Sequence, residues 1–325
     1  MRWIRWSLVI LLIVAPACVH AQTTRQVARI GFPYAGTSEC RSDGRVEALL
    51  GELRNLGYAT GKNLQLERKC YANADGMRKL LNGFISDRVD VIVVPGPAAA
   101  IAARALTRDI PIVCTSCGDP LDNGLVTSLA RPGGNVTGFA SLSAELIGKR
   151  LALLKEAVPG ASRIGALINP ENPGTRATLK ALDDASKVLN VRIERFDYRA
   201  LGDLENALKT AASTGIGAII VQDDPFATAN HRRIADMASR FRLPASAGVL
   251  ESADAGLFMS YGVNREDLYR RTAGYLDRIL KGAKPGDLPF EQAEKFDFVV
   301  NLRTAKAFGI LVPHSILVQA TRVIE

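Results

Sequence analysis

The sequence of 325 residues lacks the signatures of several functional classes. It has no block of about five or six basic residues and no Lys or Arg interleaved with aromatics, so nothing points to nucleic acid. No stretch reaches the roughly 20 uncharged apolar residues of a membrane-spanning helix. Three histidines are present, but no Ser, His and Asp set, Gly-Lys-Ser phosphate loop, Gly-x-Gly-x-x-Gly turn or metal-ligand cluster emerges. The sequence therefore supports no enzyme, cofactor site or metal site.

The composition is that of a globular protein with buried cores. Hydrophobic residues make up 47% of the chain and charged residues 23%. At roughly 100 to 200 residues per domain, the length indicates about two domains. The formal charge of +8 falls to +6 without Arg2 and Arg5, which lie in a segment that we expect to be removed. This modest excess is typical of a solvated surface.

Residues 1–21 have the pattern of a signal peptide. Two arginines precede an apolar run over 8–15. The segment ends in Val19-His20-Ala21, which resembles the cleavage site of a signal peptide. We therefore predict cleavage after Ala21 and an exported, soluble, periplasmic protein. Cys18 offers an alternative, because it resembles the lipidated cysteine of bacterial lipoproteins, although Ala15 stands where that pattern usually has Leu.

Four cysteines remain after removal of this segment: Cys40, Cys70, Cys114 and Cys117. An even number in an oxidising compartment favours structural disulfides. Of the three possible pairings we favour Cys40 with Cys70 and Cys114 with Cys117. The Cys-x-x-Cys spacing of the second pair also fits a redox site. However, this pair follows an apolar run and lies at the end of a predicted strand, whereas redox pairs normally lie at the start of a helix.

The chain repeats itself at an offset near 130 residues. Four landmarks recur in the same order: 28–31 as 162–165, 63–68 as 190–195, 90–97 as 217–225, and 110–111 as 243–244. A repeat of this kind reports architecture independently of any single motif. Two equivalent lobes are the simplest interpretation.

Within each lobe, short apolar runs alternate with amphipathic segments, as in βαβ units. In the first lobe we expect strands near 28–32, 63–68, 89–95 and 110–115 and helices near 41–57, 75–87 and 97–107. In the second lobe we expect strands near 162–168, 191–196, 217–222 and 256–261 and helices near 173–189, 203–214 and 226–241. Strands that are apolar on both faces need helices on both sides. The predicted fold class is therefore α/β, with two Rossmann-like lobes built on parallel sheets.

The C-terminal part departs from the repeat. It predicts a helix near 265–281, a strand near 296–301 and a short helix after Leu302. We expect three crossings between the lobes, near 135–138, 261–264 and 284–288, which together make a hinge. The N-terminal lobe would then comprise 26–136 and 262–285, and the C-terminal lobe 137–261 and 286–325.

A ligand of an open parallel sheet lies beyond the carboxyl ends of its strands, so facing lobes would form one cleft. The turn Gly96-Pro97-Ala98 would offer backbone N–H groups at a helix start to an anionic group. Thr115 opens a second loop of the first lobe.

Several side chains near the expected cleft are candidate ligand contacts. Asp119, Asp223 and Asp224 could bind a ligand's ammonium or hydroxyls, with capping as the alternative. Asn169 and Asn172 could hydrogen-bond a polar ligand, although Asn-Pro is also a turn signal. The aromatic candidates for stacking are Tyr34, Phe226 and Tyr261, with a place in the core as the alternative.

Four segments resemble a known family: Gly118 to Gly138, Gly148 to Glu156, Phe258 to Gly262 and Ile279 to Pro285. They are similar to substrate-binding proteins of ABC transporters of the tryptophan/tyrosine type, over nearly the whole chain from about 26 to 325. The resemblance implies a type I periplasmic-binding-protein fold that closes on a solute and hands it to a membrane permease. It also implies ligand contacts from Asp119, Ser143, Asn169, Asp223 and Tyr261.

The leading hypothesis is thus a monomeric, exported receptor for a small polar or aromatic solute, such as an amino acid or an aromatic acid. It has an ABC permease as partner and needs no cofactor. The alternatives are a periplasmic sensory module and a thiol-disulfide enzyme built on Cys114 and Cys117. If Asp119 and Asn169 contact solute, Asp119→Ala and Asn169→Ala should weaken binding at nearly unaltered stability. If they cap turns, the reverse should hold.

Overall fold

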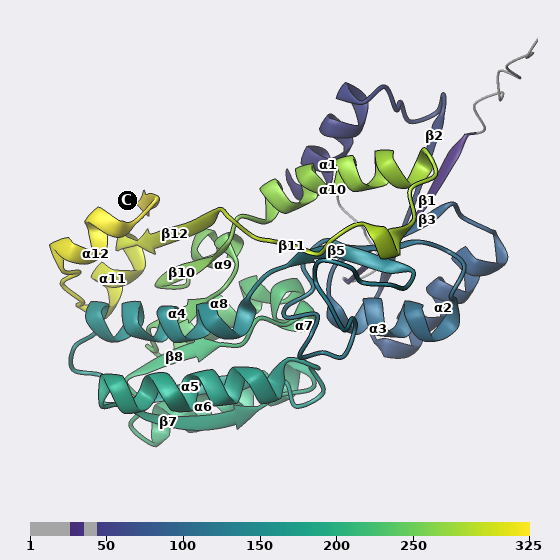
Figure 1. The fold of residues 1–325 in the computed structure, drawn as a ribbon. Helices are drawn as coiled ribbons and strands as arrows, with labels where there is room; N and C mark the ends of the chain where they lie inside the picture. Colours follow the sequence, from purple (N-terminus) through teal and green to yellow (C-terminus); the bar gives the residue numbers. More distant parts are fainter. Residues whose placement is uncertain (1–26, 36–43) are drawn as a thin grey trace, which may run out of the picture.

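The chain forms two α/β lobes that lie side by side (Figure 1). The structure is a computed structural model and describes residues 27–35 and 44–325. Within these residues, the first sheet has six strands in the order β11-β5-β4-β3-β1-β2, and the second has seven in the order β13-β12-β10-β9-β8-β6-β7. Nearly all neighbouring strands are parallel, which confirms the predicted fold class.

The first lobe places a buried sheet between two helical layers. Its elements are β1 (Ala28–Ala35), α1 (Gly44–Asn55), β2 (Leu64–Tyr71), α2 (Ala74–Ser86), β3 (Val91–Val94), α3 (Pro97–Leu106), β4 (Ile112–Cys114) and β5 (Val136–Ala140). All four residues of β3 are buried, which explains its uniformly apolar sequence. One apolar cluster joins the sheet to α1 and α10, and another joins it to α2 and α3.

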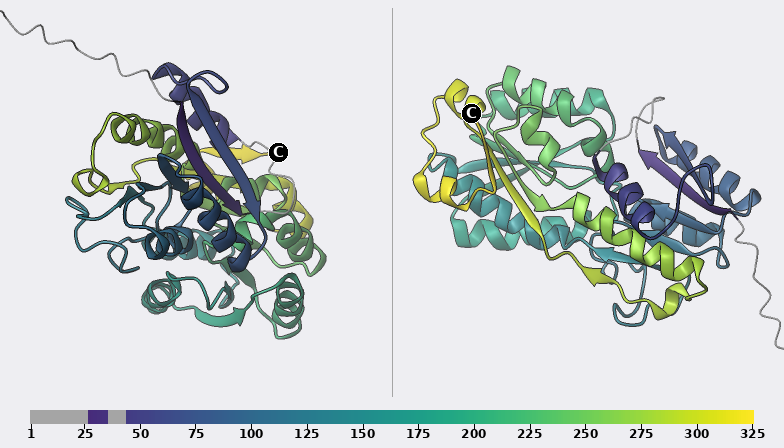
Figure 2. Two further views of the ribbon diagram at one scale, coloured as in Figure 1. Left: turned by 90° about the vertical axis from the view of Figure 1, so that its right-hand side faces the viewer. Right: turned by 90° about the horizontal axis from the view of Figure 1, so that it is seen from above.

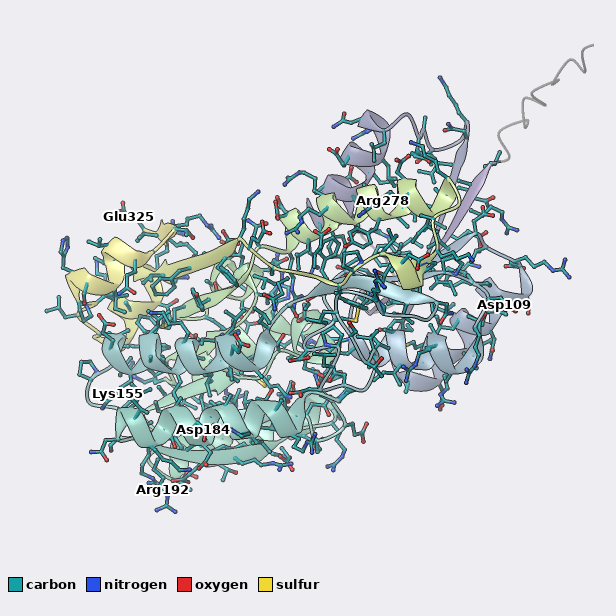
Figure 3. The ribbon with its side chains drawn as sticks, viewed as in Figure 1. Asp109, Lys155, Asp184, Arg192, Arg278 and Glu325 are labelled. Atoms are coloured by element: carbon teal, nitrogen blue, oxygen red, sulfur yellow. A yellow bond between two sulfur atoms is a disulfide. The ribbon has the colours of Figure 1, made fainter. Side chains whose placement is uncertain are left out.

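The second lobe repeats this plan. Its elements are α4 (Ser143–Ala157), β6 (Arg163–Ile168), α5 (Thr175–Leu189), β7 (Arg192–Asp197), α6 (Leu201–Ser213), β8 (Ala218–Val221), α7 (Pro225–Ala229), α8 (His231–Arg240), β9 (Ala245–Ala247), α9 (Leu250–Asp254) and β10 (Met259–Val263). The helix predicted over 226–241 is two helices, because Asn230 ends α7 and begins α8. Charged side chains such as Asp184 and Arg192 point outward (Figure 3), as the solvated-surface interpretation requires.

The C-terminal part completes both lobes. Its elements are α10 (Arg265–Leu280), a 3-10 helix over Pro285–Asp287, β11 (Glu291–Gln292), β12 (Phe296–Asn301), α11 (Leu302–Phe308), α12 (His314–Gln319) and β13 (Arg322–Ile324). Helix α10 packs against α1 of the first lobe, whereas β12 pairs antiparallel with β10 of the second. The view from above in Figure 2 shows the chain returning to the second lobe through β11 and β12.

The crossings between the sheets differ in part from the predicted positions. Strand β5 pairs with β4, and β11 pairs with β5, so both belong to the first sheet. The sequence analysis had placed nearly all of β5 and all of β11 in the second lobe. All five residues of β5 are buried, and Thr137 Oγ1 donates to Leu288 O at 2.8 Å. The first and third crossings therefore follow Ala140 and Gln292, while the second lies at Asn264, within the predicted range.

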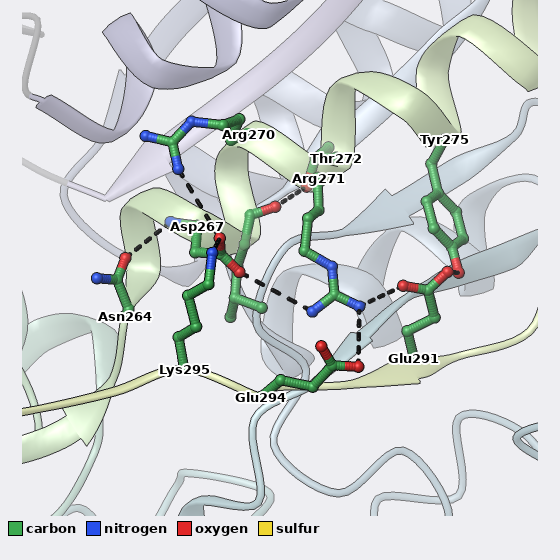
Figure 4. Close-up of polar contacts among 10 residues, drawn as sticks. Asn264, Asp267, Arg270, Arg271, Thr272, Tyr275, Glu291, Glu294 and Lys295 are labelled. Carbon is green, nitrogen blue, oxygen red and sulfur yellow. Dashed lines mark hydrogen bonds and ion pairs between the residues drawn. The ribbon is translucent and has the colours of Figure 1, made fainter.

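A polar cluster around the buried Asp267 joins the second and third crossings (Figure 4). Asn264 N donates to Lys295 O at 2.8 Å, and Lys295 Nζ lies 2.6 Å from a carboxylate oxygen of Asp267 on α10. Arg271, one turn further along α10, pairs with Glu291 of β11. These contacts tie the two connecting strands to the first turns of α10.

The predicted Cys114–Cys117 disulfide is present, with Cα atoms 5.7 Å apart. It closes the turn that leaves β4, beside Gly138 of β5. Gly138 has a φ of 143°, and an added Cβ would lie 2.0 Å from Cys114 O, so this position requires glycine. Cys70 is also disulfide-bonded, and its predicted partner Cys40 lies outside the described residues.

Two further predictions, the signal peptide over 1–21 and lipidation of Cys18, lie outside the described residues. Among the helices that are described, none combines the length and the apolar character needed to cross a bilayer.

Candidate ligand-binding cleft

A cavity of about 970 Å³ lies between the lobes, where the carboxyl ends of their strands meet. The first lobe contributes the end of β1, the start of α3 and the loop after β4. The second lobe contributes the starts of α4, α5 and α7, and the hinge contributes Arg265 and Tyr269 of α10. Both lobes and the hinge thus share one cleft.

Eight of the predicted site residues line this cavity: Tyr34, Gly96, Pro97, Asp119, Ser143, Asn172, Asp223 and Asp224. The other five do not: Ala98, Thr115, Asn169, Phe226 and Tyr261. Thr115 is fully buried, and its hydroxyl lies 3.4 Å from Val94 O. Whether any of the eight contacts a solute stays a prediction.

The half-buried ring of Tyr261 packs against the apolar clusters of both lobes. It is edge-on to Phe298, with ring centroids 6.0 Å apart, and stacks with Phe296 at 6.4 Å. Its backbone carbonyl accepts a hydrogen bond of 2.9 Å from Arg150 Nε. A place in the core, the alternative weighed from the sequence, is therefore what the structure gives this residue.

Asp223 is held by a buried arginine. Arg150 of α4 has no exposed surface, and its Nη2 lies 3.0 Å from Asp223 Oδ2. Its remaining donors bind the backbone oxygens of Tyr261 and Val221. Gly248 makes room for this pair, because an added Cβ would lie 1.8 Å from Asp223 Oδ1. Because it is paired and hydrogen-bonded, the guanidinium tolerates complete burial.

Asp224 caps a helix and anchors a loop. Its Oδ1 accepts from the backbone N–H of Phe226 and Ala227 at the start of α7. Its Oδ2 accepts from the side-chain amides of Asn169 and Asn172, each at 3.0 Å. This geometry favours the capping interpretation for Asp224, and the bond of 3.0 Å from Glu171 N to Asn169 Oδ1 favours the turn interpretation for Asn169.

Asp119 also forms a turn of its own. Its Oδ1 accepts from Leu121 N at 2.9 Å and from Asp122 N at 3.2 Å. The Asp119 carboxylate lines the cavity and at the same time stabilises the loop that follows the disulfide.

Two helices begin at the cavity lining, at Gly96-Pro97 and at Ser143. In α3 the first helical bond runs from Ala100 N to Gly96 O, so the N–H groups of Ala98 and Ala99 precede the helical ladder. In α4 the first residue, Ser143, lines the cavity, and its Oγ lies 3.1 Å from Ser141 Oγ. Such donors suit an anionic group.

Contacts across the cleft join the two lobes. Arg45 of α1 donates to Tyr34 OH, and its Nε lies 3.6 Å from Glu251 Oε1 of α9. Burial, followed by the neighbouring Tyr269 and the Asp224 carboxylate, raises the pKa of Tyr71 to about 12.

Sequence reasoning missed Arg45, Arg150, Glu251 and Arg265. Arg45 and Arg265 stand in the first turn of helices that begin at the cleft, a position that could have marked them. Arg150 carries no such signal, because a charged residue in the middle of a helix is usually solvated. His231 also lines the cavity; it is half-buried, and its Nδ1 lies 2.7 Å from Thr228 O.

Residues 41–324 match the family of ABC transporter substrate binding proteins. The chain belongs to this family. As such it adopts the type I periplasmic-binding-protein fold, in agreement with its two mainly parallel sheets. Family members are binding proteins, and the described residues contain no group of His, Cys, Asp and Glu that could hold a metal ion.

Relatives support this family assignment. The chain is 26% identical to a tyrosine-binding protein of Clostridioides difficile over 79% of its own length and 74% of the relative's. A conserved domain protein of Vibrio cholerae has a TM-score of 0.85 at 26% identity, covering 92% of this chain and 100% of that one. An ABC domain of Streptococcus pneumonia in complex with L-Trp has a TM-score of 0.81 at 22% identity, covering 91% and 100%.

Proposed function

We propose that this protein is the exported solute-binding receptor of an ABC importer. It captures a small polar or aromatic molecule, of the amino-acid or aromatic-acid kind, in the interlobe cleft and presents it to a permease in the inner membrane. The chain acts as a monomer and carries out no covalent chemistry. The predicted site residues that line the cleft form the solute contacts.

The cleft between the lobes carries this proposal. Its lining comes from both lobes, so only a closed arrangement brings all its contacts to one solute. A solute that contacts both lobes stabilises the closed state over the open one by that difference in contacts. The crossings after Ala140, at Asn264 and after Gln292 would serve as the hinge.

The kind of solute is inferred from the relatives. One is named a tyrosine-binding protein, and another was solved with L-Trp. The cleft offers Tyr34 and Tyr269 as aromatic surfaces and the start of α3 as an anion site. Aromatic amino acids and aromatic acids are therefore the first probes to test.

Titration with L-tryptophan is the most direct experiment. Both tryptophans of the chain, Trp3 and Trp6, precede Ala21, so a protein that begins at residue 22 contributes no tryptophan fluorescence. Binding would shift the emission of the ligand itself. A thermal-shift screen extends the test to other solutes, because a ligand at a hundred times its Kd stabilises the native state by about 2.7 kcal/mol.

A pair of matched variants ties any response to the cleft. Ser143→Phe fills the cavity at the start of α4, whereas Ser239→Phe adds the same ring at an exposed position of α8. We expect Ser143→Phe to abolish the response and Ser239→Phe to retain it. Failure of amino acids, aromatic acids and nucleosides alike to bind would contradict the receptor function.

A further inference from the structure

The charged residues that line the cleft differ in whether their charge is already compensated. Most of the acidic ones have a partner within the protein. Asp223 pairs with Arg150 at 3.0 Å, and Glu251 with Arg45 at 3.6 Å. Asp254 of α9 pairs with Arg322 at 2.7 Å. These pairs leave little net negative charge on this part of the lining.

The remaining aspartates are occupied differently. Asp224 accepts four hydrogen bonds from a helix start and two asparagines, and Asp119 accepts two from its own turn. Asp122 is the exception: within the described residues it has no ion pair, but it is exposed to water. Among the described residues of the cleft, a ligand's ammonium group thus finds no buried carboxylate without a hydrogen-bond or ion-pair partner.

The arginines show the opposite pattern. Arg265, the first residue of α10, lines the cavity but forms no ion pair within the described chain. Its Nε is buried and has no hydrogen-bond partner there. Arg232 and Arg233 at the start of α8 also line the cavity and lack ion-pair partners among the described residues, but both are exposed. Among the described residues that line the cleft, Arg265 is therefore the one half-buried charged group that lacks an ion pair and has a buried atom without a hydrogen-bond partner.

A half-buried guanidinium with an unsatisfied buried N–H is costly unless something supplies an acceptor. A carboxylate matches the fork of N–H groups that arginine presents. Arg265 directly follows Asn264, where the chain crosses between the lobes for the second time. A group bound by Arg265 would therefore lie against the hinge as well as the cleft.

We propose that the solute is an organic anion whose carboxylate is bound by Arg265, and that an ammonium group on the solute contributes nothing to its affinity. This assignment rests on the receptor function proposed above. Among the solutes named there, it predicts organic acids rather than amino acids. Arg265 then determines specificity by supplying a half-buried cationic donor whose Nε has no hydrogen-bond partner within the described chain.

Matched sets of three compounds test the assignment. One set is L-tyrosine, its deaminated analogue hydroxyphenylpropanoate and its decarboxylated analogue tyramine. The other is L-leucine with its corresponding acid and amine. Thermal shift and calorimetry on the native protein should show that an acid binds at least as tightly as its amino acid. The amines should not bind.

Variants of α10 then test the role of Arg265. Arg265→Gln should weaken binding of the acid by about 10- to 100-fold, the loss expected for a hydrogen bond to a charged group. Arg270→Gln neutralises an exposed arginine of the same helix and should change the affinity by less than about twofold. Arg265→Lys should restore part of the loss, because it keeps the charge without the planar fork.

The outcomes separate this proposal from the receptor function. Binding of an amino acid without binding of its acid would overturn the anion assignment and leave the receptor function standing. Unchanged affinity of Arg265→Gln for the acid would overturn the role of Arg265. Response to nucleosides alone would overturn the anion assignment as well. If none of the compounds binds the native protein, both proposals are contradicted.

Discussion

At the scale of single residues, the carboxylates that the sequence marked as ligand contacts are largely engaged in structure. Asp119 and Asp224 cap a turn and a helix, and Asp223 is held by an arginine that has no exposed surface. Sequence reasoning found these positions because Asp before Pro and paired Asp at a strand end are visible signals. It could not find Arg150, whose partners lie 71 to 111 residues away.

Arg150→Ala should strongly destabilise the protein. It removes the partner of Asp223 and the donors to the backbone oxygens of Tyr261 and Val221, and it leaves a cavity beside α4. We expect the free energy of unfolding to fall by about 3–5 kcal/mol, as measured by urea denaturation. Arg176→Ala on neighbouring α5 is the control, because Arg176 is exposed. Equal losses in the two variants would refute the role of the buried pair.

Gly248→Ala tests the same pair from its other side. The new methyl group would lie 1.8 Å from Asp223 Oδ1 and 2.5 Å from Arg150 Nη2, so the ion pair must move. We expect a loss of about 1–3 kcal/mol in unfolding free energy, together with weaker solute binding. Gly202→Ala meets nothing within 4 Å and should be neutral. Wild-type stability and affinity in Gly248→Ala would show that the site adapts freely.

At the scale of elements, apolar periodicity predicted the long strands and helices well, but it did not predict the shortest strands. The strand predicted over 296–301 coincides with β12, and that over 191–196 differs from β7 by one residue at each end. Strands β9 and β13 have only three residues each, which is too short for a pattern to emerge. Helix α4 was not predicted. The first crossing was expected near 135–138, shortly before this helix begins, and the sequence analysis used Gly148 to Glu156 only as a family motif.

The hinge strand β12 offers a test by pH. Burial raises the pKa of Asp297 above its ordinary value, nearby Glu266 adds to the shift, and Asn264 and Arg322 oppose it. Its Oδ2 is buried without a hydrogen-bond partner in the described structure. A carboxyl group with a raised pKa in the folded state favours folding most below its unfolded pKa, and this contribution is lost as the pH rises through the folded pKa.

Asp297→Asn should therefore stabilise the protein at pH 7, and the gain should shrink as the pH falls toward the ordinary pKa of 3.8. Urea midpoints of wild type and variant between pH 4 and pH 7 give the comparison. Asp236→Asn, at an exposed position of α8, should show no such trend. A gain that does not vary with pH would show that ionisation of Asp297 is not its cause.

The disulfide in the turn after β4 allows a test between a structural role and a redox role. Cys114 and Cys117 are both fully buried. Mild reductant should therefore leave this bond intact in the native protein and open it only in urea, as read by alkylation and mass spectrometry of the peptide that contains both residues. Rapid reduction of the native protein, together with turnover of a disulfide substrate, would instead support the thiol-disulfide enzyme.

At the scale of the whole molecule, the repeat at an offset near 130 residues predicted two lobes, and the sheets confirm them. The contacts between the lobes were beyond reach of the sequence. They join residues such as Arg45 and Glu251, which are 206 positions apart in the chain and belong to no common motif. A local pattern reports which face of an element is buried, but it does not report which distant side chain meets that face once the hinge closes.

The Arg45–Glu251 ion pair gives a test of closure itself. It spans the cleft at 3.6 Å, with side chains 13% and 40% exposed, so it contributes only when the lobes meet. Arg45→Gln and Glu251→Gln should each weaken solute affinity by up to about fivefold, the range of a partly exposed pair. In a double-mutant cycle followed by calorimetry, the double variant should lose less than the sum of the single losses, because one change already breaks the contact.

The pair between Arg240 and Glu205, 3.0 Å apart, lies within the second lobe, and Arg240→Gln and Glu205→Gln should leave affinity unchanged. Additive losses at Arg45 and Glu251, or equal losses at the intralobe pair, would mean that closure does not depend on this contact.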